Sequence, residues 1–204
     1  QFPSIDYYFN LENHQESLDV LNVGLEVNDG IIKITGRSGT GKSLLCRLFV
    51  DKIADCYHPV YILNPYFNFS ELLQYILADL QVEFCEDDTT SQLTKALYTK
   101  ALELKKQRKK LVLLFDESQY ISRDGLEAIQ IISNFECEGE KLCQIVIVGG
   151  LDLDDKLVGF QHFLQRISFS YTLNPMTRED VESYIYHRLA KAANGAVSHG
   201  ISFT

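Results

Sequence analysis

The chain alternates short, continuous apolar runs with longer stretches in which apolar residues recur every three or four positions. Continuous runs without polar alternation are typical of strands buried on both faces of a parallel sheet. Such runs occur at residues 31–35, 58–65, 111–115 and 144–150, and a run that alternates apolar and polar residues, as edge strands do, occurs at 167–173. The pattern therefore predicts an α/β fold in which a parallel sheet carries helices on both faces.

Helical spacing separates these runs. Leu18, Leu21 and Leu25 share one face of a first predicted helix. Further helices are expected after residue 42, from an N-cap at Ser70, from about Ser91 to Lys110, after Ser122, and from a capping box of Thr177 and Asp180 to about Ala193. Residues 1–9 predict an aromatic-rich extended stretch, and residues 28–30 predict a tight turn.

Composition narrows the possible functions. The 204 residues, 46% of them hydrophobic, can bury one good core, and the net charge of −9 argues against a sequence-independent grip on nucleic acid. The five cysteines lack C-x-x-C spacing, so they indicate neither a disulfide framework nor a zinc site and fit a reducing cytoplasm. No apolar run approaches the roughly 20 residues of a membrane span, and the N-terminus lacks a basic segment followed by an apolar one. We therefore expect neither a membrane-spanning helix nor export of the protein.

The first candidate for chemistry is residues 36–43, Gly-Arg-Ser-Gly-Thr-Gly-Lys-Ser, which fit the P-loop pattern G-x-x-x-x-G-K-[ST] between a predicted strand and a predicted helix. Glycines let successive N–H groups point at a phosphate chain, and the helix dipole adds its positive end. Lys42 is expected to reach the β- and γ-phosphates of ATP, and the Ser43 hydroxyl to ligate the bridging Mg²⁺. The predicted nucleotide-binding residues are Gly36, Ser38, Gly39, Thr40, Gly41, Lys42, Ser43 and Leu44.

The second candidate is the pair Asp116 and Glu117, where the apolar run 111–115 ends abruptly in two carboxylates. In P-loop enzymes an acid at this point holds Mg²⁺, often through water, and an adjacent glutamate can polarise the attacking water. Asp116 is therefore the predicted second Mg²⁺ ligand beside Ser43, and Glu117 is the predicted base. The alternative is that both carboxylates cap the helix that follows.

Two further features each have a functional and a structural interpretation. Residues 105–110, Lys-Lys-Gln-Arg-Lys-Lys, fit a surface for nucleic acid or anionic lipid. Cations at a helix C-terminus also complement the helix dipole, and we favour that interpretation. His14 could touch a nucleotide base at the edge of the site, but we favour a surface or capping position for it.

These residues also carry a family resemblance. The chain resembles the AAA+ ATPases of the general secretion pathway protein A type, and within them most resembles the ATPases of mannose-sensitive haemagglutinin (MSHA) pilus biogenesis. The match also includes Ser133, Asn134, Glu136 and Lys141. Many ATPases share the P-loop and the acidic pair, whereas the stretches Asn10-Leu11-Glu12 and Gln165-Arg166-Ile167 are narrower matches.

The resemblance implies a P-loop NTPase fold of the AAA+ (ASCE) type. Residues 1–29 would form an N-terminal extension and helix, 30–176 the ATPase core, and 177–204 the first helix of a truncated C-terminal helical lid. It also implies a homo-oligomer, arranged as a ring, that acts on pilus or secretion machinery at the cytoplasmic face of the inner membrane.

Several departures from the family bear on the site. The family usually has an acidic residue where this chain has Arg37, and Gln-Pro where it has residues 150–151. Gln119 or Asp152 would then have to sense the γ-phosphate. Arg166 is the candidate for an arginine that acts on a neighbouring subunit's nucleotide, and a structural salt bridge is the alternative role.

We therefore expect an ATPase that binds ATP and Mg²⁺, serves pilus biogenesis or type II-like secretion, and has Lys42, Glu117 and Arg166 as catalytic residues. One alternative is a nucleotide-gated assembly scaffold with little or no hydrolysis, which the incomplete lid favours. Another is a DNA-bound regulator of the transposition type, which the basic run supports and the acidic net charge opposes. No element that would distinguish ATP from GTP is identifiable.

Overall fold

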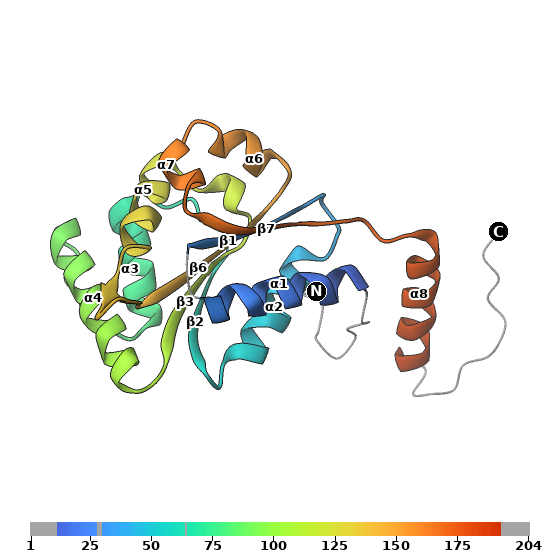
Figure 1. Cartoon of the computed structure of the whole chain (residues 1–204), viewed down its shortest axis with the longest axis horizontal. Coiled ribbons are helices and arrows are strands. Elements are labelled where there is room, and N and C mark those ends of the chain that lie inside the picture. The colour runs from blue at the N-terminus through green and yellow to red at the C-terminus, as the bar shows by residue number, and fades with distance from the viewer. Residues whose placement is uncertain (1–11, 28–29, 64, 193–204) are drawn as a thin grey trace.

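The computed structural model describes residues 12–27, 30–63 and 65–192, and its centre is a five-stranded parallel sheet (Figure 1). The strands are β1 (Ile31–Gly36), β2 (Tyr57–Ile62), β3 (Lys110–Phe115), β6 (Cys143–Gly149) and β7 (Ile167–Leu173). Their order in space is β2-β3-β6-β1-β7, and every neighbouring pair is parallel. The predicted α/β fold and its parallel sheet are therefore confirmed, with β7 at an edge as its alternating pattern indicated.

Each face of the sheet packs against its own helices (Figure 1). Ile32 and Val112 face one group of helices, whereas Ile31 and Leu113, their neighbours along the same strands, face the other. The first group is α1 (Glu12–Val27) and α2 (Lys42–Ile53), and the second includes α3 (Phe69–Asp79), α4 (Thr90–Lys106) and α5 (Arg123–Ile132). Each such buried aliphatic side chain contributes roughly 1.5–3 kcal/mol relative to exposure. Burial on both faces explains why the strands read as continuous apolar runs.

The helix that follows β2 starts earlier than the sequence indicated. Asn68, not Ser70, caps α3, because its Oδ1 accepts the N–H of Glu71 at 3.0 Å and the Glu71 carboxylate accepts the Asn68 N–H at 2.9 Å. This reciprocal pair satisfies two N–H groups that a helix start would otherwise leave unbonded. Ser122 caps α5 as predicted, with its Oγ accepting the N–H of Gly125 at 3.0 Å.

The basic run that follows α4 does not form one continuous helix end. The helix begins at Thr90, close to the predicted start, and ends at Lys106 instead of Lys110. Arg108 then adopts a φ of 58°, which turns the chain, and Lys110 is already the first residue of β3. The run is therefore divided between a helix end, a turn and a strand.

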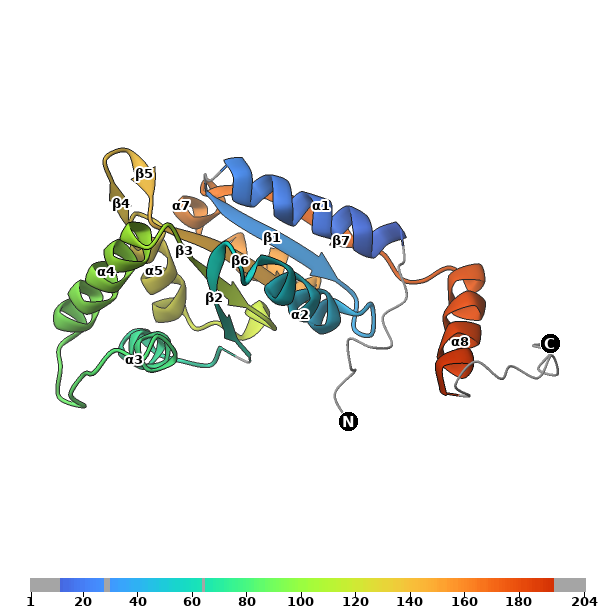
Figure 2. The same ribbon diagram turned by 90° about the horizontal axis from the view of Figure 1, so that it is seen from below.

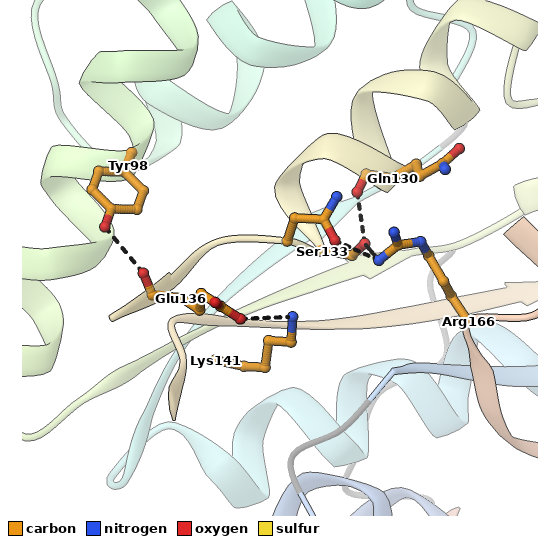
Figure 3. Close-up of polar contacts among 7 residues, drawn as sticks. Tyr98, Gln130, Ser133, Glu136, Lys141 and Arg166 are labelled. Atoms are coloured by element: carbon orange, nitrogen blue, oxygen red, sulfur yellow. Dashed lines mark hydrogen bonds and ion pairs between the residues drawn. The ribbon is translucent and has the colours of Figure 1, made fainter. Parts of the chain in front are cut away.

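Several short elements were not predicted. They are the two-stranded antiparallel hairpin of β4 (Glu136–Cys137) and β5 (Glu140–Lys141), the helices α6 (Asp152–Leu157) and α7 (Gln161–Leu164), and the 3₁₀ turn η2 (Ser118–Tyr120). Each is too short and too polar to produce a periodic pattern. The hairpin lies beside α4, where the hydroxyl of Tyr98 donates to the Glu136 carbonyl at 3.0 Å (Figure 3).

Beyond β7 the chain leaves the sheet and forms α8 (Arg178–Ala192), which stands apart from the helices that cover the sheet (Figures 1 and 2). The predicted capping box is confirmed, since the Thr177 N–H donates to Asp180 Oδ2 at 2.9 Å and the Asp180 N–H donates to Thr177 Oγ1 at 3.2 Å. The expectations for residues 1–9 and 28–29 fall outside the described residues. Over the described ranges, none of the helices has the length and apolarity needed to cross a bilayer.

Candidate functional site

Three loops meet at the carboxyl edge of the sheet. β3, β6 and β1 are neighbours, and because they are parallel their carboxyl ends lie at the same edge. The P-loop, residues 36–43, follows β1, Gly150 follows β6, and Asp116 and Glu117 follow β3. The fold therefore brings together the two motifs that the sequence singled out.

Glycine is required in the P-loop for backbone and steric reasons. Gly39 and Gly41 have φ values of 82° and 89°, in the left-handed region that favours glycine. A Cβ on Gly41 would lie 2.8 Å from Cε1 of His14. Gly41 is also the N-cap of α2 and provides no side-chain cap, so the N–H groups of the first helical turn are directed at whatever binds in the loop.

Lys42 stabilises the P-loop from within. Its side chain is buried, and its Nζ donates to the carbonyls of Gly36 and Arg37, each at 3.0 Å. The Thr40 hydroxyl donates to the same Arg37 carbonyl at 2.9 Å. The loop thus holds its curled shape through its own hydrogen bonds. A phosphate would offer Lys42 charged acceptors in place of these neutral carbonyls, and charged acceptors form the stronger bonds.

His14 lies against the P-loop, so the surface or capping position that we favoured is wrong. Its side chain is 2% exposed, and its Nε2 hydrogen bonds to the Thr40 carbonyl at 2.9 Å. The ring fills the space beside Gly41. Leu18 and Leu21 anchor the same helix, α1, to the sheet and thereby fix the position of His14.

Asp116 is fully buried at the end of β3, and two donors hold its carboxylate. The Tyr61 hydroxyl donates to Oδ2 at 2.7 Å, and the Glu117 N–H donates to Oδ1 at 2.9 Å. Burial, the neighbouring Cys46 and the bond to Asp116 together raise the pKa of Tyr61 well above its usual value, so its hydroxyl stays a donor. Tyr61 lies on β2, and no local pattern in the sequence marks it.

The side chain of Gln119, two residues further along the chain, holds the Glu117 carboxylate. Its backbone has a φ of 53° and a ψ of 42°, a left-handed conformation that costs a residue with a side chain about 1–2 kcal/mol. Gln119 Nε2 donates to Glu117 Oε2 at 2.6 Å, and the N–H of Gly150 donates to Gln119 Oε1 at 2.9 Å. Gln119 therefore joins the candidate base to the end of β6.

Two cavities flank Lys42, and both are bordered by Ser38, Lys42 and Glu117. One, of ≈ 690 Å³, extends from the P-loop to Gln119 and Asp152. The other, of ≈ 600 Å³, extends to α8, and its apolar wall consists of Met176, Val181, Tyr184 and Ile185. A polar and an apolar compartment on either side of one lysine suit a ligand that has a phosphate chain and a flat base.

Most of the predicted nucleotide-binding residues border these cavities. They are Gly36, Ser38, Gly39, Gly41, Lys42, Ser43 and Leu44. Thr40 is instead buried within the loop and braces it.

The predicted Mg²⁺ ligands, Ser43 and Asp116, offer a hydroxyl and a carboxylate, which are the hard oxygen donors that Mg²⁺ prefers. Within residues 12–27, 30–63 and 65–192, no group of three or more His, Cys, Asp or Glu side chains could hold a metal ion. Two protein oxygens still fit Mg²⁺, because this ion commonly takes its other ligands from phosphate and water.

Arg166 lies at the other edge of the sheet, far along β1 from the P-loop. Its backbone carbonyl accepts the N–H of Ile31, the first residue of β1. Its Nη1 donates to Asn134 Oδ1 and, at 3.4 Å, to Ser133 Oγ, so the side chain points toward the end of α5 (Figure 3). These partners are an amide and a hydroxyl, not the carboxylate of a salt bridge. Arg166 therefore takes no part in the P-loop site of its own chain.

A sequence model of the AAA domain family matches residues 25–157. General secretion pathway protein A of Aeromonas hydrophila is 31% identical over 192 residues, which cover 93% of this chain and 35% of that protein. The chain thus spans about a third of the length of this relative. The resemblance to the general secretion pathway protein A type is confirmed, and the narrower resemblance to MSHA pilus ATPases stays a prediction.

Solved structures share the fold. Cdc6p from Pyrobaculum aerophilum superposes with a TM-score of 0.75 at 22% identity, covering 94% of this chain and 52% of that chain. The ADP form of the ORC2 protein of Aeropyrum pernix gives a TM-score of 0.68 at 17% identity, covering 89% and 52%. The ORC1 protein of the same organism, in complex with DNA, gives 0.68 at 14% identity, covering 88% and 48%. At these identities the likeness shows the fold alone.

Proposed function

The chain belongs to the AAA domain family, and from that premise we propose that it binds ATP and hydrolyses it. The observation that carries the proposal is that Lys42 and Glu117, from loops at the ends of separate strands, border the same two cavities. Catalysis of phosphoryl transfer by P-loop proteins consists mainly of positioning and electrostatic stabilisation, which require this convergence.

The P-loop would hold the phosphate chain. The first turn of α2 contributes its N–H groups and the positive end of its dipole. Lys42 would exchange the carbonyls of Gly36 and Arg37 for the β- and γ-phosphates. Ser43 and Asp116 would hold Mg²⁺, which when bound offsets the negative charge of the phosphates. Tyr61, through its bond to Asp116, would keep that carboxylate in a fixed orientation.

Glu117 would orient the attacking water and accept its proton. The bond from Gln119 to Oε2 would fix the direction of the carboxylate, and Oε1 would be the oxygen that accepts from the water. Gln119 would thus act on the base rather than touch the γ-phosphate, which is one of the two sensor roles that the sequence left open. Asp152, on the wall of the polar cavity, is the other candidate sensor.

Arg166 would act on the nucleotide of a neighbouring copy, because it lies at the opposite edge of the sheet from its own P-loop. The site would then be complete in a homo-oligomer. The wider setting that we propose is pilus biogenesis or type II-like secretion at the cytoplasmic face of the inner membrane. Support for that setting comes from general secretion pathway protein A, of which this chain spans 35%.

A nucleotide-gated scaffold is the second candidate function. It is favoured by the residues that follow β6, Gly150 and Leu151, which bring no polar side chain to the γ-phosphate position. A DNA-bound regulator has weaker support, because the net charge of −9 opposes the phosphate contacts that hold DNA.

Phosphate release from Mg-ATP, measured over a range of protein concentrations, tests the proposal. We expect turnover per chain to rise with concentration, as a shared site requires, and Glu117→Gln to slow it about 100-fold or more while ATP still binds. Glu127→Gln, an exposed glutamate on α5, is the matched control. Binding of ATP without Glu117-dependent release at any concentration would favour the scaffold, and full turnover in Glu117→Gln would remove Glu117 from the mechanism.

A further inference from the structure

A second polar cavity lies at the amino edge of the sheet, the opposite edge from the P-loop. Its volume is ≈ 440 Å³. Figure 2 shows the elements around it: the C-terminal ends of α1 and α4 and the hairpin of β4 and β5 gather where the strands begin. Five cations border the cavity, namely Lys105, Arg108, Lys109, Lys110 and Lys141. The cavities at the P-loop share none of these residues.

Some of these cations are already neutralised. Lys105 forms ion pairs with Glu140 at 3.0 Å and with Glu138 at 3.5 Å, and so ties the end of α4 to the hairpin. Lys141 pairs with Glu136 at 3.5 Å (Figure 3). Lys105, in the last turn of α4, has the structural role that a basic helix end commonly has, and Lys141 joins β5 to β4.

The other three cations differ from Lys105 and Lys141. Among the described residues, Arg108, Lys109 and Lys110 form none of the ion pairs that join Lys or Arg to a carboxylate. Glu26 and Glu140 also border the cavity, and Glu140 is already bound to Lys105. Among the residues that border the cavity, positive charges therefore outnumber negative charges.

Lys110 is the most unusual member of this group. Its Nζ is buried and has no hydrogen-bond partner among the described residues. Burial lowers the pKa of Lys110 to about 8, with a further contribution from the charge of Lys141 and an opposing one from Glu140. Burying an amine without a partner is unfavourable, so a structural role does not explain why a lysine occupies this position.

Arg108 occupies a backbone position that glycine would fit better than arginine does. It follows α4 with a φ of 58°, and the N–H of Lys109 donates to the Leu104 carbonyl at 2.9 Å. This closing turn of a helix usually contains glycine, which adopts a positive φ without strain. The arginine costs conformational energy here and places a cation at the cavity.

We propose that this cavity binds the phosphate group of a ligand, with Lys110 and Arg108 as its principal partners. The cavity is large enough for a phosphate together with a small attached group, and Leu25, Tyr57 and Leu142 provide an apolar wall for that group. A free phosphorylated molecule and the headgroup of an anionic lipid share this chemistry. The inference is independent of ATP binding, because the site lies at the other edge of the sheet.

Calorimetric titration with inorganic pyrophosphate tests the proposal. The Lys42→Ala variant is used throughout, so that the P-loop contributes little to the signal. Adding Lys110→Met or Arg108→Gly is expected to weaken pyrophosphate binding about tenfold or more, as loss of a charged hydrogen bond does. Adding Lys52→Met, on the exposed end of α2, is expected to leave the affinity unchanged.

The Arg108→Gly variant separates lost binding from lost folding, because glycine suits the backbone there better than arginine does. Equal affinities in the Lys110→Met, Arg108→Gly and Lys52→Met variants would overturn the proposal. The same variants are then sedimented with vesicles of phosphatidylglycerol and of phosphatidylcholine. Binding to phosphatidylglycerol that needs Lys110 and Arg108 identifies a lipid headgroup as the source. Pyrophosphate binding without vesicle binding identifies a free phosphorylated molecule.

Discussion

The two edges of the sheet hold their charged side chains in different ways. At the carboxyl edge, Lys42, Asp116 and Glu117 each have a partner from the protein: loop carbonyls, the Tyr61 hydroxyl and the Gln119 amide. At the amino edge, the Nζ of Lys110 is buried and has no hydrogen-bond partner within the part of the chain that the structure describes. The first arrangement would keep the candidate catalytic groups in place between binding events, and a ligand would have to exchange existing bonds. The second leaves a buried amine without a hydrogen bond, which is unfavourable and which the proposed phosphate ligand would relieve.

Among substitutions that test the difference between the two edges, Lys42→Ala is expected to have the largest effect. This substitution removes the cation from the carboxyl edge, and we expect ATP affinity to fall about 100-fold or more because two charged phosphate contacts are lost. Titration with a fluorescent ATP analogue measures it. Lys52→Ala, on the same helix, is the control and should bind normally. Unchanged affinity in Lys42→Ala would refute the P-loop assignment.

Tyr61→Phe tests whether the partners at the carboxyl edge matter for activity. It removes the hydroxyl that donates to the buried Asp116 carboxylate. Residues that orient metal ligands in this way typically support activity by about 10- to 100-fold, and we expect Mg-ATP turnover to fall by that factor. Tyr75→Phe removes an exposed hydroxyl with a 3.5 Å contact and should leave turnover unchanged. Equal turnover in both variants would show that the Tyr61 bond is dispensable.

Gln119→Leu distinguishes a residue that positions the base from one that senses the γ-phosphate. We expect kcat to fall about tenfold, less than the roughly 100- to 10,000-fold that loss of a general base costs, with KM for ATP unchanged. The physical reason is that the Gln119 amide hydrogen bonds to Glu117 and to Gly150, so its loss would disturb the position of the base and not the binding of the nucleotide. Steady-state kinetics decide the matter, because a raised KM would indicate direct contact with the nucleotide. Gln130→Leu, on α5, is the control.

The smallest effect is expected at the amino edge, where Lys110→Met should raise the free energy of unfolding by about 1 kcal/mol at neutral pH. The pKa of Lys110 lies at about 8 in the folded chain, below its value of 10.5 when unfolded. The charged form is therefore penalised in the folded state below pH 8, and the penalty fades as the pH rises toward 10.5. Urea unfolding at several pH values measures this. A gain that grows with pH would contradict the explanation, and Lys52→Met should change little.

Motifs whose residues are contiguous could be found from the sequence. The P-loop was recognised because Gly39, Gly41 and Lys42 stand in one short segment, and the acidic pair because it ends a buried strand. The strands were found because burial on both faces leaves runs that are mainly apolar and do not alternate with polar residues.

Contacts between distant segments could not be found in this way. Tyr61 reaches Asp116 across 55 positions, and His14 reaches Thr40 across 26, so neither contact leaves a local pattern. The basic run 105–110 was assigned as a single helix end because spacing cannot show that Arg108 turns the chain and Lys110 enters the sheet.

The order of the strands has a further consequence, for the time at which the site forms. β1 pairs with β6 and β7, which are made last, whereas β2 and β3 pair with each other earlier along the chain. Pairings between segments so far apart in sequence close large loops and form slowly. During synthesis, the strand that leads into the P-loop must therefore wait for residues beyond 143 before it gains its first neighbour in the sheet. We therefore expect the P-loop, the candidate ligand-binding segment, to be among the last parts of the sheet to fold.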